Sequence, residues 1–223
     1  MCFSPQASFT LSGILIGVGA AAVARSASPA HRMLAAAPVL FGVQQAAEGV
    51  VWLTVGAPAH ADTLRLAVDI FLGFALVVWP LWVPLALRRI ERDQTRRRIL
   101  TALCWLSAVM SVSAAVLVSR WQPFATIVGH SIAYSYPGTS NAVLHLLLVV
   151  AYIVTTIGPF FVSTSKLART LGITLVVSVV AAALIRRDSL TSVWCFFAAA
   201  LSVLIFFAVS GTKIGGAIER SSQ

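Results

Sequence analysis

Charged residues are scarce in this chain, which excludes an ordinary water-soluble domain. Only 10% of the 223 residues are charged, against about 25% in soluble proteins, while 59% are hydrophobic and the mean hydropathy is +0.92. We therefore expect a polytopic membrane protein. The chain also lacks internal repeats, low-complexity segments and long linkers, so residues 1–223 are expected to form a single transmembrane domain.

Cysteines and known catalytic motifs are equally sparse. Cys2, Cys104 and Cys195 are too few for a disulfide scaffold and show no CxxC spacing. HExxH, GxSxG, GxGxxG and P-loop motifs are missing, and Lys213 lies beyond the last apolar run, which argues against a retinal protein. No basic segment or lipobox precedes the first apolar run, so we expect the first helix to be retained.

Seven apolar stretches are each able to supply the roughly 20 residues that a bilayer requires. They predict an all-α fold, a seven-transmembrane helix bundle. The predicted helices cover residues 8–24, 33–55, 63–87, 99–118, 140–163, 168–185 and 190–211. In the first helix, Gly13 and Gly17 form a small-xxx-small pair of the kind that lets another helix approach closely.

Basic residues are distributed unevenly between these stretches. Twelve of the 16 fall on one predicted side, namely Arg25, Arg32, Arg88, Arg89, Arg92, Arg96, Arg97, Arg98, Lys166, Arg169, Lys213 and Arg220. By the positive-inside rule, the N-terminus lies outside and the C-terminus lies in the cytoplasm. This distribution also accounts for the net charge of +9 without a nucleic-acid partner.

The connection between the fourth and fifth predicted helices has a different composition. Residues 120–139 are β-prone and close on the turn signal Pro137-Gly138. We expect a short β-prone cap over the outer mouth of the bundle. It would carry His130, Tyr134 and Tyr136 to that mouth.

The most informative stretch is residues 41–52, FGVQQAAEGVVW, because it places two amides and a carboxylate inside a membrane span. Gln44, Glu48 and Trp52 recur at helical spacing on one face, and Gln45 lies beside them. An ionisable group within a span costs roughly 2.5 to 3.5 kcal/mol on insertion scales. Such a group normally faces the bundle interior, so this face is expected to point inward.

Other polar residues are expected at a similar depth. At 1.5 Å per residue, Glu48, Asp69, His145 and Cys195 all lie roughly 8 to 10 Å below the outer surface, and Cys2 and His130 approach this layer from above. Carboxylates, imidazoles and thiolates are ligands for zinc or another transition metal. The predicted metal ligands are Glu48, Asp69, His130, His145, Cys2 and Cys195, with Gln44, Gln45 and Tyr134 as hydrogen-bonding groups around them.

Plainer explanations exist for the same residues. Polar side chains scattered over several helices also serve as interhelical hydrogen bonds. Asp69 is one helical turn from Arg65 and forms an ion pair with it in the simplest alternative. Cys2 and Cys195 map to the oxidising side, where a disulfide is the alternative to metal ligation.

Three functions follow from this layer of polar residues. The first is a metal-dependent membrane hydrolase acting on a lipid or small amphiphile, with Glu48 and His130 as catalytic residues. The second is a membrane sensor or a small-molecule or ion transporter in which Glu48 titrates, although the missing internal repeat weakens the transporter. The third is a haem protein with His130 or His145 as axial ligand. The oligomeric state is left open.

Four segments resemble an uncharacterised bacterial membrane-protein family whose members begin Met-Cys-Phe-Ser. They are Met1–Ser4, Leu40–Trp52, His130–Tyr134 and Ser192–Ala199. The resemblance implies a multi-pass protein of the bacterial cytoplasmic (inner) membrane and no known activity. It singles out Cys2, Gln45, Glu48, His130, Tyr134, Trp194 and Cys195, so Trp194 joins the candidate ligand-binding residues. A looser likeness to seven-helix alkaline ceramidases is architectural only, since their paired histidines are missing here.

Overall fold

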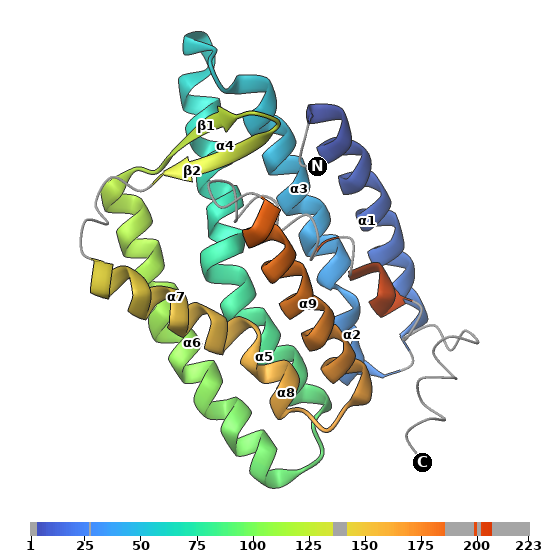
Figure 1. Ribbon diagram of the computed structural model, residues 1–223. Coiled ribbons are helices and arrows are strands. Elements are labelled where there is room, and N and C mark those ends of the chain that lie inside the picture. The colour runs from blue at the N-terminus through green and yellow to red at the C-terminus, as the bar shows by residue number, and fades with distance from the viewer. Residues whose placement is uncertain (1–3, 27, 136–141, 186–198, 200–201, 207–223) are drawn as a thin grey trace.

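The computed structural model describes residues 4–26, 28–135, 142–185, 199 and 202–206. This part of the chain is a helical bundle with a β-hairpin across one end (Figure 1). The elements are α1 Pro5–Arg25, α2 Pro29–Ala35, α3 Ala37–Thr54, the 3-10 turn η1 Pro58–His60, α4 Ala61–Gly73, the π-helical turn η2 Phe74–Val78, α5 Trp79–Ile90, α6 Gln94–Trp121, β1 Phe124–Val128, β2 Ser131–Ser135, α7 Ala142–Thr156, α8 Gly158–Val162 and α9 Lys166–Ile185. The prediction of a mostly helical fold is confirmed.

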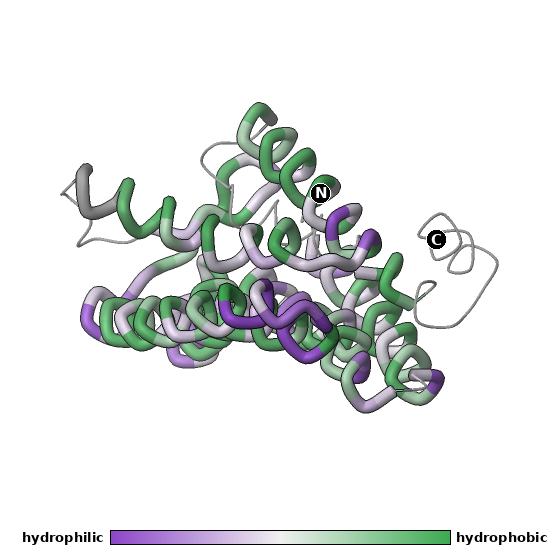
Figure 2. Tube along the Cα trace, turned by 90° about the horizontal axis from the view of Figure 1, so that it is seen from below, coloured by the Kyte–Doolittle hydropathy of each residue, from purple (hydrophilic) through white to green (hydrophobic). Residues whose placement is uncertain are grey.

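Five described helical segments are long and apolar enough to cross a membrane. They are Pro5–Arg25, Pro29–Thr54, Pro58–Ile90, Gln94–Trp121 and Lys166–Leu184, and they overlap the predicted helices 8–24, 33–55, 63–87, 99–118 and 168–185. Hydrophilic residues occupy only short parts of an otherwise hydrophobic trace (Figure 2). Most of the predicted helix 190–211 lies outside the described residues.

The predicted helix 140–163 differs from the structure, which divides its described part in two. Helix α7 ends at Thr156, and α8 begins at Gly158. Pro159 follows at the start of α8 and has no amide hydrogen to continue the α-helical ladder. The predicted single helix is therefore interrupted at Ile157, between Thr156 and Gly158.

Helix starts follow local capping chemistry. The side chains of Ser4, Ser28 and Asp93 accept hydrogen bonds of 3.2, 3.3 and 2.8 Å from backbone N–H groups two or three residues later. Pro5 and Pro29 occupy the first helical positions, where a missing N–H is tolerated.

Glycines allow α1 to pack closely against α3. A Cβ on Gly19 would lie 2.6 Å from the Val39 backbone nitrogen, and one on Gly42 would lie 2.6 Å from the Ile16 side chain. Gly49 meets the Phe9 ring in the same way, at 2.8 Å. The two helices therefore pack closely only because these side chains are absent.

The expectation that Gly13 and Gly17 form the close contact is wrong. Both are exposed, and no atom of a neighbouring described element lies within 4 Å of where their Cβ atoms would be. Spacing alone did not show which face of α1 meets a neighbour.

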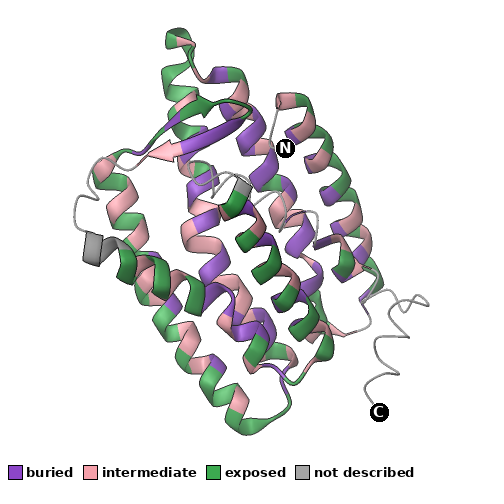
Figure 3. Cartoon of the chain, viewed as in Figure 1, coloured by how far each residue is buried: buried purple, intermediate pink, exposed green. Residues whose placement is uncertain are grey.

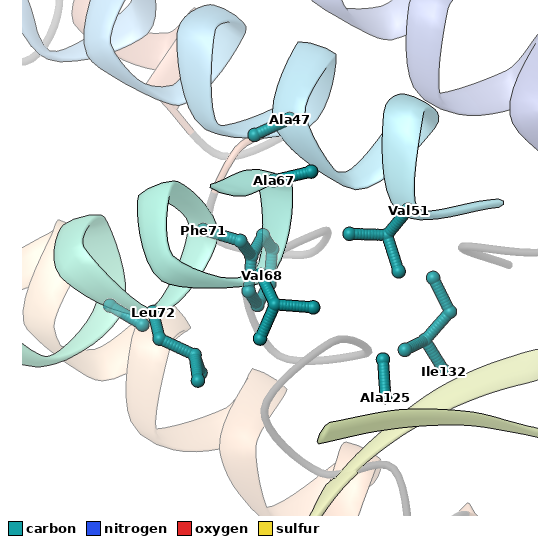
Figure 4. Close-up of a cluster of buried hydrophobic side chains, with 9 residues drawn as sticks. Ala47, Val51, Ala67, Val68, Phe71, Leu72, Ala125 and Ile132 are labelled. Atoms are coloured by element: carbon teal, nitrogen blue, oxygen red, sulfur yellow. The ribbon is translucent and has the colours of Figure 1, made fainter. Parts of the chain in front are cut away.

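Burial is highest in the helices between Pro29 and Ile90. Buried residues concentrate on α3 and on the segment from α4 to α5, whereas α1 and α9 are exposed along their outer sides (Figure 3). One apolar cluster lies at the hairpin end and joins Val51 and Phe71 to Ala125 and Ile132 of the hairpin (Figure 4). A second apolar cluster lies around Trp79 and Leu87 of α5.

The β-prone segment forms an antiparallel hairpin in which Phe124 pairs with Ser135 and Val128 with Ser131. Its turn is Gly129-His130, where Gly129 has a φ of +62° that favours glycine. Pro137 and Gly138, the predicted turn signal, lie outside the described residues. The hairpin crosses the ends of α3 and α4 (Figure 1).

At the opposite end, Glu91 ties two loops together. Its carboxylate accepts hydrogen bonds from the backbone N–H of Thr164 at 2.7 Å and from the Thr164 hydroxyl at 2.8 Å. The backbone N–H groups of Arg92 and Asp93 also donate to it, each at 3.0 Å. The loop between α5 and α6 is thereby joined to the loop between α8 and α9.

These bonds shift the titration of Glu91. Burial raises the pKa of its carboxyl, but hydrogen bonds from Asp93, Thr164 and Ser163 outweigh this effect, so the pKa falls from its ordinary 4.5 to about 2. The carboxylate is therefore held ionised inside the joined loops, where it is only 4% exposed.

We expect Gly19→Ala and Gly42→Ala to destabilise the bundle by about 1 to 3 kcal/mol each, because the new methyl group overlaps α3 or α1. Gly13→Ala is the matched control on the same helix and should change stability by less than about 0.5 kcal/mol. Thermal unfolding in detergent measures the difference. Equal melting temperatures for all three variants would contradict the glycine contact.

We expect Glu91→Gln to lower the melting temperature at pH 7, because an amide –NH2 would face the N–H donors of Thr164. The unfolded chain takes up the Glu91 proton first as the pH falls, since the folded-state pKa is the lower one. The advantage of the wild type is therefore complete above about pH 4.5 and is lost as the pH falls through about 2. Asp93→Asn, which keeps a capping oxygen, serves as control. A difference in melting temperature between the wild type and Glu91→Gln that does not change with pH would refute the low pKa of Glu91.

Candidate functional site

The polar face of α3 is fully buried. Gln44, Gln45 and Glu48 are each 0% exposed. At 100° per residue, Ala37, Phe41, Gln44 and Glu48 form one stripe along the helix, and Gln45 lies between that stripe and the glycines that contact α1. The three polar side chains thus occupy the interior of the bundle.

Gln44 joins α3 to both sides of the π-helical turn. Its Oε1 accepts a hydrogen bond of 2.7 Å from Trp79 Nε1, and its Nε2 donates to the Phe71 carbonyl oxygen at 3.4 Å. Phe71 precedes the turn Phe74–Val78 and Trp79 follows it. The Trp79 ring also stacks on Phe41, with centroids 3.8 Å apart. π-Helical turns are frequent at functional sites, and this one places the indole that binds Gln44.

Gln45 stands in contrast to its neighbour. Within the described part of the chain, neither its amide nitrogen nor its amide oxygen has a hydrogen-bond partner. Gly42 and Gly49, on either side of it along α3, contact Ser12 and Phe9 of α1, so Gln45 lies between the levels of these two residues. The Ser8 hydroxyl is buried and likewise has no partner among the described residues.

Two further polar groups of this kind lie towards the hairpin. Trp52 Nε1 and the Ser131 hydroxyl are buried without a hydrogen bond to any described residue. Each unsatisfied buried group costs about 1 to 3 kcal/mol. A polar ligand or ordered water that pairs with Gln45 and these groups would remove that cost, so the hairpin end of α3 has the chemistry of a polar binding site.

The hairpin packs directly on this region. Ile132 and Ala125 contact the apolar cluster that contains Val51 and Phe71 (Figure 4). The Tyr134 ring stacks on Phe71 with centroids 4.7 Å apart and planes 12° apart. Phe71 therefore contacts the hairpin through its ring and Gln44 through its carbonyl oxygen.

His130 does not join the buried cluster. It lies in the turn of the hairpin and is exposed, whereas Glu48 is 0% exposed. Asp69 is partly exposed on α4. The prediction for Asp69 rested on its depth, which does not determine the direction of a side chain around its helix, whereas His130 was expected to reach the site from the outer loop.

The predicted metal ligands are only partly within the described structure. Cys2, Trp194 and Cys195 lie outside it, and so does the side chain of His145, whose backbone belongs to α7. Among the side chains that are described, no group of three or more histidines, cysteines, aspartates or glutamates could hold a metal ion. Cys104, the one described cysteine, is a free thiol on α6.

Glu91 and Trp79 are structurally important residues that the sequence analysis missed. The signal for Glu91 was weak: it is one of two acidic residues, with Asp93, in the strongly basic segment 88–98. Trp79 stands beside Pro80 in the apolar run of the predicted helix 63–87, and nothing in its spacing indicated a buried partner. In the structure it is 5% exposed and bonded to Gln44.

The five apolar helices, their close packing and the buried polar stripe together define a helical membrane protein. The chain belongs to a family of unknown function, DUF6629, whose model matches residues 1–220. The predicted resemblance to an uncharacterised family is thus confirmed. No match was found among curated proteins or solved structures.

We expect Trp79→Phe to destabilise the bundle by about 1 to 3 kcal/mol, because it leaves the buried Gln44 oxygen without its donor. Trp105→Phe, at a side chain 72% exposed on α6, is the matched control and should be nearly neutral. In a double-mutant cycle with Gln44→Leu, the two changes should couple by about 0.5 to 3 kcal/mol. Additive losses in thermal unfolding would show that the bond contributes nothing.

Proposed function

We propose that this protein binds a small polar or amphiphilic ligand inside the membrane, at the hairpin end of α3, and responds to it as a sensor or transporter. The observation that carries the proposal is the Gln45 amide, which is fully buried and has no hydrogen-bond partner in the described structure. Buried amides are normally satisfied, and exceptions tend to mark functional sites. A ligand that forms hydrogen bonds with the Gln45 amide would explain why this amide is buried without a protein partner.

The side chains suggest the ligand's chemistry. Gln45 offers two N–H donors and one acceptor oxygen, and the Glu48 carboxyl group is one helical turn away. The Ser8 hydroxyl adds a group that can donate or accept. A compact amine, alcohol or amide matches this set, and an amine would also neutralise an ionised Glu48.

Phe71 connects the proposed ligand site to the hairpin through direct contacts. Its carbonyl oxygen binds Gln44, and its ring stacks on Tyr134 of the hairpin. A ligand or proton that shifts α3 at Glu48 would therefore shift the packing of the hairpin. In this proposal, Glu48 changes its protonation or occupancy, and the hairpin reports the change on the outer side.

The proposed orientation puts the hairpin outside and the C-terminus in the cytoplasm of a seven-span protein of a bacterial cytoplasmic membrane. It is supported by the basic residues of the loops opposite the hairpin, which the positive-inside rule assigns to the cytoplasm. Arg25, Arg89, Arg92, Arg97 and Lys166 are all exposed at that end. The hairpin then forms the outer cap.

A metal-dependent hydrolase is a separate hypothesis for the same end of the bundle. It would combine Glu48 with ligands such as Cys2, His145 and Cys195, while haem would use His130 or His145. If Glu48 and His130 hold a metal together, Glu48→Gln and His130→Ala both lower metal content by mass spectrometry. The exposed position of His130 predicts instead that His130→Ala leaves ligand binding unchanged.

The proposal is tested by thermal unfolding of purified protein with butylamine, ethanolamine, acetamide, butanol and zinc chloride. Without ligand, Gln45→Leu should be neutral or stabilising, because it removes an unsatisfied polar group. A ligand at 100 times its Kd adds about 2.7 kcal/mol to the wild type. Gln45→Leu and Glu48→Gln should abolish that gain.

Two comparisons guard against indirect effects. Thr126→Val, on the exposed strand β1, should keep the full ligand response. If Glu48 only links helices, Glu48→Gln will behave as the wild type with every compound, since an amide retains much of the hydrogen bonding. That result, or a Gln45→Leu variant that is strongly destabilised without any ligand, would argue against the proposal.

A further inference from the structure

An apolar cavity lies away from the polar site, in the half of the bundle next to the basic loops. Its volume is about 70 Å³. Residues from six helices and from the segment 202–206 line it, among them Trp79, Trp82, Ala86, Leu87, Leu175 and Ile205. One water needs roughly 10 to 15 Å³ of such space, so the cavity accommodates roughly five groups of that size.

The cavity is long in the direction of α5. Its lining on this helix runs from Trp79 to Leu87, which spans about 12 Å at 1.5 Å per residue. A segment of a hydrocarbon chain fits this shape.

The walls of the cavity are held in place by bonds directed away from it. Trp79 Nε1 donates to Gln44, and Trp82 Nε1 donates to the Met33 carbonyl oxygen at 3.1 Å. These bonds keep both indole rings from collapsing into the space.

The hydroxyl groups of the lining are also occupied. Thr156 donates to the Tyr152 carbonyl oxygen, and Ser202 donates to the Ala199 carbonyl oxygen at 2.6 Å. With these hydroxyls bonded to their own helices, the surface of the cavity is hydrocarbon, and water has few groups to bind there.

Basic residues gather at the end of the cavity marked by Leu87. Arg89 follows two residues later and is exposed. Because it comes seven residues after Trp82, it lies on the same face of α5. The Arg25 guanidinium lies 5.5 Å from the ring of Phe206, which adjoins the cavity-lining Ile205. The acidic Glu91 of this end is already bonded to Thr164. Basic pockets between helices are suited to anionic lipid headgroups.

We propose that this cavity binds one acyl chain of an anionic phospholipid whose headgroup contacts Arg89 and Arg25. The site is independent of the polar ligand site around Gln45. Its occupant is a membrane lipid, because the cavity is apolar and elongated and its positive end matches a phosphate group.

Brominated lipids that quench tryptophan test this site in the full-length protein. The protein is placed in phosphatidylcholine nanodiscs with a small fraction of dibrominated phosphatidylglycerol or dibrominated phosphatidylcholine. The difference between wild type and Trp82→Phe isolates the emission of Trp82. We expect phosphatidylglycerol to quench this emission at several-fold lower mole fraction, about fivefold for one basic contact.

Matched variants distinguish binding of the acyl chain in the cavity from recognition of the headgroup. Ala86→Phe or Leu175→Phe, which fill the cavity, should remove the phosphatidylglycerol-specific quenching, whereas Ala102→Phe on the exposed side of α6 should not. Arg89→Gln should reduce the preference for phosphatidylglycerol several-fold, and Arg120→Gln at the opposite end should leave it unchanged.

Two results would overturn the proposal. Equal quenching by both lipids, unaffected by the cavity-filling variants, would mean that Trp82 meets only bulk lipid. Equal quenching that still disappears in Ala86→Phe would mean a chain site without headgroup selection, contrary to the anionic assignment. Neither result bears on ligand binding by Gln45, which the thermal shifts measure separately.

Discussion

The hydrogen bond from Trp79 to Gln44 is the interaction on which the arrangement of the interior depends. It is 2.7 Å long, fully buried, and joins residues 35 positions apart. In a membrane no water replaces a lost partner, so two such groups on facing helices determine how those helices align. The bond sets α3 against α5, brings Phe41 onto the Trp79 ring, and thereby forms one wall of the apolar cavity.

Among the described residues, buried polar groups are hydrogen-bonded at the loop end of the bundle, and several lack partners at the hairpin end. At the loop end, the Glu91 carboxylate receives hydrogen bonds from two loops, and Arg96 donates to the Val162 carbonyl oxygen at 2.9 Å beside it. At the hairpin end, the Gln45 amide and the Trp52 Nε1 atom are buried without described partners. Satisfied networks make a structure rigid, whereas unsatisfied groups are tolerated chiefly where binding or movement compensates for them. The loop end therefore has the character of a rigid scaffold, and the ligand site that we propose lies at the hairpin end.

Part of this arrangement followed from residue spacing. Gln44, Gln45 and Glu48 were expected on an inward face, and all three are 0% exposed. The depth estimate that placed Asp69 at the level of Glu48 was less informative, because depth leaves rotation about the helix undetermined. Glu91 could not be identified at all, since its partner Thr164 is 73 residues away and the two loops meet only through tertiary packing.

Sequence alone determined the membrane character of the chain, the extent of its first four apolar segments and the inward polar face of α3. These features depend on local hydropathy and helical period, which neighbouring residues set among themselves. Tertiary structure decided which glycines let α1 approach α3, where the π-helical turn places Trp79, and which amide is satisfied. Each of these depends on the direction in which one helix faces another, and that direction results from packing of the whole bundle and not from any single segment.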